Sequence, residues 1–256
     1  MVTSKQRAIA EVLGALDDKI AADEALVRKA RGVARRIGVT ACLRSEGPLV
    51  RMDEVAIVTK GASYRSEDLR EGKGWLVSLK CVGRTGEFRP DGMKPYSGPS
   101  KASQTVLSGD VLVAQTDLTQ KAEVIGRPIR MPKLGASGVL VASLDFSIVR
   151  PQEMLTREAL FALVSTQDFR EHALAYCNGT TVLHMGSQAI PSYEFRLPDP
   201  ATVSTITETT APLFELADSI AHETESLATL RDTLLPKLLS GELRLRDAES
   251  LVEAAV

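Results

Sequence analysis

Two carboxylates in one short segment are the first candidates for chemistry in this sequence. Asp110 and Asp117 lie in the run GDVLVAQTDLTQ (109–120), and a third carboxylate, Asp145, follows another apolar run. Carboxylates could hold a metal ion for hydrolysis of a phosphodiester. However, Asp110 follows Gly109, as a turn-forming residue does, and Asp117 lies in a polar loop. We therefore expect structural roles for both, and a nuclease that uses Asp117 and Asp145 is the weaker interpretation.

The histidines and cysteines are too scattered in the sequence to indicate a catalytic or metal site. They are His172, His184 and His222, and Cys42, Cys81 and Cys177. No histidine has a serine or cysteine in a recognisable nucleophile motif, and the cysteines lack metal-ligand spacing. The sequence also lacks a phosphate-binding glycine loop, a dinucleotide fingerprint and an Asn-Pro-Pro-Tyr-like methyltransferase segment. It therefore predicts a non-catalytic chain with no metal and no cofactor of its own, in a reducing cytoplasm.

Polar and basic side chains in the middle of the sequence have the chemistry to contact DNA. Arg and Lys pair with guanine or phosphate, and Gln pairs with adenine. Residues 44–150 contain 16 Lys and Arg against 12 Asp and Glu, whereas residues 201–256 contain 4 against 10. This distribution favours phosphate binding by the middle segment. The predicted contact residues are Lys60, Ser63, Tyr64, Lys80, Arg84, Arg89, Lys94, Tyr96, Lys101, Ser103, Gln104, Gln115 and Thr116.

Long helices at both ends of the chain are expected to position this segment. Over residues 1–37, a set of residues recurs at spacings of alternately four and three, which is the pattern of a coiled-coil seam. Its members are Ile9, Leu13, Leu16, Ile20, Asp23, Val27, Ala30, Ala34 and Ile37, of which only Asp23 is polar. Gly38 is predicted to end the helix as a left-handed cap.

The C-terminal segment has a matching seam. Its members are Ile206, Thr210, Leu213, Ala217, Ile220, Thr224, Leu227, Arg231 and Leu234. Pro212 is expected in the first turn or at a kink, and Pro236 is expected to bend or end the helix. We predict that the two helices pair as an antiparallel coiled coil. Two separate amphipathic helices, each on its own core, are the alternative.

Between these helices the pattern predicts a globule made mostly of strands. The apolar, β-branched runs are VAIVT (55–59), WLVSL (75–79), DVLVAQ (110–115), AEVIG (122–126), GVLVAS (138–143), DFSIV (145–149) and TTVLH (180–184). One helix is predicted at about 156–175, and Trp75 is assigned to the core because it lies in an apolar run. The fold class is therefore α+β, with a mostly-β domain at 44–198 flanked by long helices at 1–43 and 199–256.

Several segments, in this order, resemble type I restriction–modification specificity (S) subunits. The stretches that resemble this family's central spacer helix and distal conserved segment are QRAIAEVLGALDDKI (6–20) and TLRDTLLPKLLSGELRL (229–245). Those that resemble its target-recognition domain are GEFRPDGMKPYSG (86–98), SGDVLVAQTDLTQKAEVIGRP (108–128), SLDFSIVRP (143–151) and NGTTVLH (178–184). The resemblance covers nearly the whole chain, but with one recognition domain instead of the family's two.

The resemblance implies a DNA-binding subunit that reads half of a bipartite target. Methyl transfer from S-adenosylmethionine would belong to a modification subunit, and translocation and cleavage with ATP and Mg would belong to a restriction subunit. A chain with one recognition domain would act as a homodimer, pair with another half-length subunit, act alone, or be a fragment of a longer subunit. The alternatives are a coiled-coil interaction adapter that does not bind DNA and a cassette that donates its recognition domain by recombination. We expect no membrane association, because the sequence has no apolar run long enough to span a bilayer.

Overall fold

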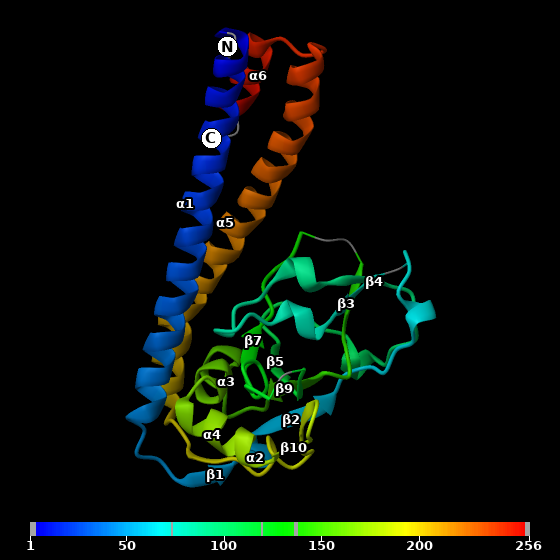
Figure 1. The fold of residues 1–256 in the computed structure, drawn as a ribbon. Coiled ribbons are helices and arrows are strands. Elements are labelled where there is room, and N and C mark those ends of the chain that lie inside the picture. Colours follow the sequence, from blue (N-terminus) through cyan, green and yellow to red (C-terminus); the bar gives the residue numbers. More distant parts are fainter. Residues whose placement is uncertain (1–3, 73, 119, 136–137, 254–256) are drawn as a thin grey trace. The chain divides into compact units, whose positions relative to one another are not determined.

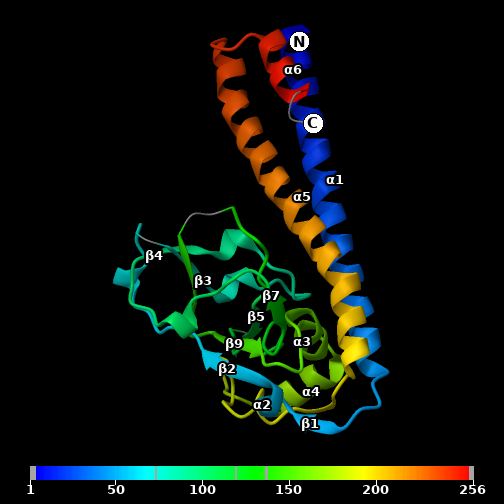
Figure 2. The same ribbon diagram turned by 180° about the vertical axis from the view of Figure 1, so that it is seen from behind.

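The computed structural model describes residues 4–72, 74–118, 120–135 and 138–253 (Figures 1 and 2). The chain forms two compact units, residues 1–31 with 215–256 and residues 32–214. We call their described parts the helical hairpin and the globular unit. Residues 1–3 and 254–256 of the predicted end segments lie outside the described residues.

The helical hairpin is built from α1 (Ser4–Leu43), α5 (Pro200–Ser240) and α6 (Leu245–Glu253), of which α1 and α5 continue into the globular unit. Arg31 pairs with Asp218 at 2.9 Å and Asp17 with Arg231 at 2.8 Å. As the residue number increases along α1, the number of its ion-pair partner on α5 decreases, so the two helices are antiparallel. The fold class predicted from the sequence, long antiparallel helices beside a sheet-rich region, is therefore confirmed.

The hairpin core follows the seam spacing. Its buried apolar side chains are Ile9, Leu16, Ile20, Leu227, Leu234, Leu238, Ala248 and Val252, and a smaller cluster contains Val27, Ala30 and Ala217. Leu13 and Ile220 are half-buried beside them. Asp23 is buried in the seam and forms an ion pair with Lys19.

The ends of the long helices differ from the sequence expectation. Gly38 does not end α1, which continues to Leu43. A Cβ at this position would lie 2.7 Å from the Cβ of Ala162, so Gly38 instead allows α3 to approach closely. Pro236 does not end α5, which runs through it to Ser240 and is followed by Gly241 at φ +79°. Pro200 opens this helix, and Asp199 accepts a hydrogen bond from the backbone N–H of Thr202 at 2.9 Å, as an N-cap residue does.

A four-stranded antiparallel sheet forms the centre of the globular unit, with the strand order β2-β9-β5-β7. The strands are β2 (Ala56–Lys60), β5 (Val111–Ala114), β7 (Pro128–Arg130) and β9 (Phe146–Pro151). Val111 and Val113 belong to one hydrophobic cluster, whereas Leu112 and Ala114 belong to another. Because alternate residues face opposite sides of a strand, β5 is buried on both faces, which explains its continuous apolar run.

Two helices cover one side of this sheet, α3 (Arg157–Val164) and α4 (Gln167–Ala175), as both views show. The sequence predicts a single helix here, but the helix is interrupted at Ser165–Thr166. Thr156 and Thr166 each accept a hydrogen bond from a backbone N–H three residues ahead, so each caps a separate helix. Phe161 packs edge-on against Phe214 of α5, with ring centroids 5.8 Å apart.

Smaller sheets complete the globular unit. Strands β3 (Gly74–Val77), β4 (Lys94–Tyr96) and β8 (Val139–Ala142) have the order β4-β3-β8, with β3 and β8 parallel. A second sheet contains β6 (Thr116–Asp117), β10 (Cys177–Asn178) and β11 (Leu183–Met185). The third pairs β1 (Leu49–Arg51) with β12 (Glu194–Arg196), and the short helix α2 (Met52–Val55) follows β1.

Two local expectations for the globular unit are wrong. The run AEVIG (122–126) forms turns instead of a strand, because the Asp117 carboxylate accepts hydrogen bonds from the backbone N–H groups of Val124 and Ile125. Trp75 is half-buried on β3 and is not part of the hydrophobic clusters formed by the described residues.

Candidate nucleic-acid interface

Three of the predicted DNA-contact segments come together beside the β4-β3-β8 sheet. Gln104 donates from Nε2 to the carbonyl of Lys60 at 3.4 Å, which joins the end of β2 to a short 3-10 turn at Ala102–Gln104. The Lys94 ammonium lies 5.9 Å from the centre of the Tyr64 ring. Lys60, Ser63, Lys101 and Ser103 are exposed around these contacts, and Tyr64, Lys94 and Gln104 are half-buried. We call these seven residues the recognition cluster.

The carboxylate of Asp145 is hydrogen-bonded and acts on Tyr64 of the recognition cluster. Asp145 accepts from Oγ1 of Thr116 at 2.9 Å and from Oγ of Ser143 at 3.1 Å, and its carbonyl accepts from the N–H of Gln115 at 2.7 Å. Burial, together with the nearby charge of Asp145, raises the pKa of Tyr64. The Tyr64 hydroxyl therefore remains a hydrogen-bond donor at neutral pH. Thr116 is buried and Gln115 is half-buried, so Thr116 holds this loop and presents little surface to a ligand.

Tyr96 is also placed inside the globular unit. It is 3% exposed and packs with Ala62, Leu76 and Val141. Its hydroxyl donates to the carbonyl of Pro99 at 2.9 Å, which fixes the start of the loop that carries Lys101. The structure thus gives Tyr96 a role in shaping the loop beside the predicted contact residues.

The remaining predicted contact residues, Lys80, Arg84 and Arg89, are exposed and follow β3. Arg84 pairs with Glu123 at 3.2 Å and Arg89 with Asp91 at 2.8 Å. Lys80 forms no ion pair with any residue that the structure describes. Exposed ion pairs are weak, so both arginines could exchange their carboxylates for phosphate at little cost.

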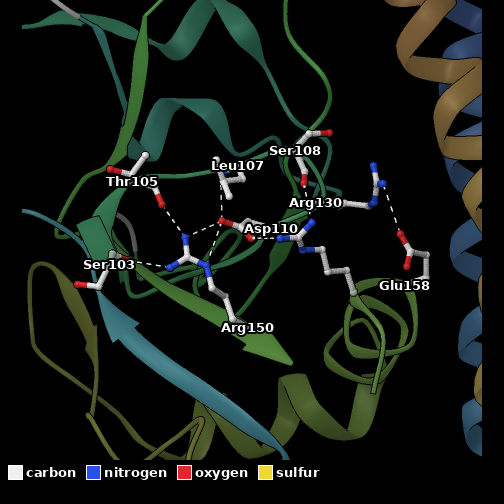
Figure 3. A network of polar contacts seen from close by, with 9 residues as sticks. Ser103, Thr105, Leu107, Ser108, Asp110, Arg130, Arg150 and Glu158 are labelled. Atoms are coloured by element: carbon white, nitrogen blue, oxygen red, sulfur yellow. Dashed lines mark hydrogen bonds and ion pairs between the residues drawn. The ribbon is translucent and has the colours of Figure 1, made fainter. Parts of the chain in front are cut away.

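A partly buried ion network, which is not apparent from the sequence, contacts the segment of the recognition cluster that contains Ser103 and Gln104 (Figure 3). Arg150 of β9 pairs with Asp110 at 2.7 Å and donates to the carbonyls of Ser103 and Thr105. These carbonyls flank Gln104, so one guanidinium fixes the backbone on both sides of a predicted base-reading residue. The opposite charges of Asp110 and Arg150, each beside a buried strand, are the only sequence signal for this pairing.

Asp110 itself is 1% exposed and closes a turn by accepting from the backbone N–H of Leu107 at 3.0 Å. Arg157 lies 3.5 Å from its other carboxylate oxygen. Asp110 thus has the turn position expected from the sequence, whereas Asp117, which was expected in a loop, is buried in the short strand β6. Within the residues that the structure describes, no three histidine, cysteine or acidic side chains are grouped as a metal site would require.

The cysteines are buried or half-buried free thiols. Burial raises the pKa of Cys42 and of Cys81 to about 12, and it also raises the pKa of Cys177. At neutral pH these thiols are protonated and therefore weak nucleophiles. A search of the described helices finds none with the length and apolarity required to span a bilayer.

Neither a family model nor a curated protein matches this sequence, but solved structures do. The type I restriction–modification S subunit from M. genitalium is 16% identical, with a TM-score of 0.59 over 92% of this chain and 61% of that chain. The HsdS subunit from Thermoanaerobacter tengcongensis is 19% identical, with a TM-score of 0.46 over 93% and 59%. A chain from a type I complex structure is 18% identical, with a TM-score of 0.43 over 93% and 60%.

The M. genitalium comparison shows that this chain has the fold of a type I S subunit, as the sequence resemblance implies. The chain spans about 60% of the length of the chains that it matches.

Proposed function

We propose that this chain, which has the fold of a type I S subunit, is a DNA-specificity subunit of a type I restriction–modification system. Residues 44–198 would bind one half of a bipartite DNA target. The flanking helices, 1–43 and 199–256, would set the spacing and dock the modification subunit. The observation that carries the proposal is the fold shared with an S subunit over 92% of the chain.

The recognition cluster supports this assignment. It brings lysines, a tyrosine hydroxyl and the amide of Gln104 together on one part of the surface, which are groups that read base edges or bind phosphate. The network of Arg150 and Asp110 fixes this surface before binding, so that less ordering entropy is lost on binding DNA.

In this proposal the chain contributes no catalytic group. An adenine methyltransferase subunit with S-adenosylmethionine would modify the target, and a restriction subunit with ATP and Mg would translocate and cleave. The complex would act in the cytoplasm, on double-stranded DNA. Two copies of the chain, or this chain with another half-length subunit, would supply the two recognition domains.

The test is a domain exchange assayed by methylation mapping. The full chain is co-expressed with candidate modification subunits, and so is a chimera whose residues 44–198 come from another S subunit. We expect methylation to move to the donor's target half-site, because the exchanged residues read sequence. A chimera that still methylates the target of this chain would contradict the assignment to 44–198.

A coiled-coil adapter predicts a different result in a simpler assay. It predicts that duplex DNA does not retain the purified chain, whereas a specificity subunit is retained and is released as salt increases. In the methylation assay, the parental chain in the same strain is the control that the modification subunit is present and active.

A further inference from the structure

A small pocket in the globular unit is lined by three arginines, and it is separate from the recognition cluster. Arg35 of α1, Arg127 before β7 and Arg170 of α4 surround a cavity of about 110 Å³. The loop residues Thr85 and Gly86 and the junction between α3 and α4 complete the lining. We propose that this pocket binds a phosphate group.

The three pocket arginines donate to backbone carbonyls, and none of them forms an ion pair with a residue that the structure describes. Arg35 donates to the carbonyl of Thr85 at 3.0 Å, Arg127 to that of Glu123 at 2.6 Å, and Arg170 to that of Ile125 at 3.0 Å. A carbonyl accepts a hydrogen bond but carries no net charge. The charges of Glu87 and Glu123 oppose that of Arg127, and the charge of Asp117 opposes that of Arg170. Glu123 also pairs with Arg84 at 3.2 Å, so its charge is shared between two arginines.

Neighbouring guanidinium groups in the pocket repel one another, Arg35 acting on Arg127 and Arg127 on Arg170. The pKa of Arg127 is lowered by burial and then by the charge of Arg35, although Glu87 and Glu123 partly oppose the shift. The pKa of Arg170 is lowered by burial and then by the charge of Arg127, although the charge of Asp117 partly opposes the shift. A bound anion would relieve this repulsion, because each guanidinium would gain an opposite charge.

The backbone around the pocket also favours an anion. Helix α4 begins at Gln167, and Thr166 and Gln167 at its N-terminus line the cavity. The exposed N–H groups and the dipole of a helix N-terminus attract negative charge. Gly86 and Gly126 line the same cavity with φ values of +85° and +73°, a conformation that glycine adopts without strain.

A phosphate group fits this lining because guanidinium groups bind its oxygens bidentately. The group could be a phosphodiester of duplex DNA or free inorganic phosphate. A DNA phosphate would connect the pocket to the predicted contact residue Arg84, which adjoins Thr85 in the same loop. Arg35 lies outside residues 44–198, so in that case α1 would contribute to DNA binding as well as to spacing.

The first arm of the test uses inorganic phosphate and therefore does not depend on the proposed function. Thermal unfolding of the full chain is measured in phosphate and in chloride at matched ionic strength. We expect phosphate at tenfold its Kd to raise the Tm by roughly 3 °C. Arg35→Gln should abolish this increase, and the adjacent Arg36→Gln should retain it, since Arg36 is also exposed but does not line the pocket.

The second arm uses duplex DNA and distinguishes the two phosphate sources. If the pocket binds a DNA phosphate, Arg35→Gln should lower the salt dependence of DNA binding by about one charge relative to Arg36→Gln. A phosphate effect without this change would assign the pocket to the free anion. Arg127→Gln is the second pocket variant, and unfolding in chloride verifies that each variant is folded.

The proposal is wrong if phosphate does not raise the Tm of the wild-type chain and the two variants have equal salt dependence. Failure of the proposed function would appear differently, as a chain that neither binds duplex DNA nor directs methylation, whatever phosphate does to its Tm.

Discussion

Asp110 shows how one buried residue can control a recognition surface that it does not reach. Its carboxylate neutralises Arg150, and Arg150 holds the carbonyls on both sides of Gln104. We expect Asp110→Asn to destabilise the chain by roughly 2–4 kcal/mol, because the variant leaves a partly buried guanidinium without its countercharge. Urea unfolding measures the effect. The control Asp91→Asn breaks an exposed pair with Arg89 and should change the stability much less, because solvent screens that pair.

The free thiols give a prediction about pH and reactivity. Burial raises the pKa of Cys42 and Cys81 from the usual range of a thiol to about 12. The native state therefore keeps both protons when the unfolded state begins to lose them, and stability should fall as the pH rises from about 9 toward 12. At pH 8, alkylation followed by mass spectrometry should label Cys177 before the other two. Fast labelling of Cys42 in the native chain would contradict its burial.

At the residue scale, the sequence indicates the structural role of a side chain better than it indicates which residue that side chain contacts. The glycine before Asp110 indicated a turn, and the structure has that turn. The ion pair between Asp110 and Arg150 joins residues 40 positions apart. It depends on the β5–β9 register, which no local sequence pattern encodes. Tyr96 illustrates the same limit, because a tyrosine in a polar loop gives no indication of whether its ring faces solvent or core.

At the scale of elements, Leu16 is the strongest test of the helical hairpin. It is 0% exposed in the core that α1, α5 and α6 share. Leu16→Asp should destabilise the hairpin by about 3–5 kcal/mol, because it buries a carboxylate without a partner. Ala15→Asp is the matched control, since it adds the same charge at the neighbouring, exposed position. Circular dichroism melting should separate the two variants, and equal melting temperatures would show that this seam does not stabilise the hairpin.

Elements defined by a regular period were predictable, whereas those defined by single residues were not. The four-three spacing in α1 and α5 matches the observed burial, because a helix surface repeats regardless of its tertiary surroundings. Gly38 was misinterpreted as a cap, since its role depends on the approach of Ala162 from a distant helix. The short strands β1 and β12 pair residues about 150 positions apart and carry no strong local pattern.

At the scale of the whole molecule, the one globular unit leads to a prediction about assembly. The bipartite target of the proposed function needs two reading surfaces, and the residues that the structure describes contain one recognition cluster, within residues 32–214. Most homo-oligomers are two-fold symmetric dimers, and such a dimer has two copies of each surface. The two copies would face in opposite directions along a DNA duplex. We therefore expect two copies of the 27.6-kDa chain to associate. The dimer should form either with the chain alone or in the complex with the modification subunit and DNA.

The symmetry of this dimer fixes the form of its target. Identical half-sites in inverted orientation, separated by a gap of constant length, should appear in the methylation map. Sedimentation gives the mass, and the map gives the symmetry, so the two measurements test the prediction independently. A monomer both with and without DNA would exclude the homodimer. A dimer-sized complex with two unlike half-sites would instead show that a different half-length subunit supplies the second reading surface.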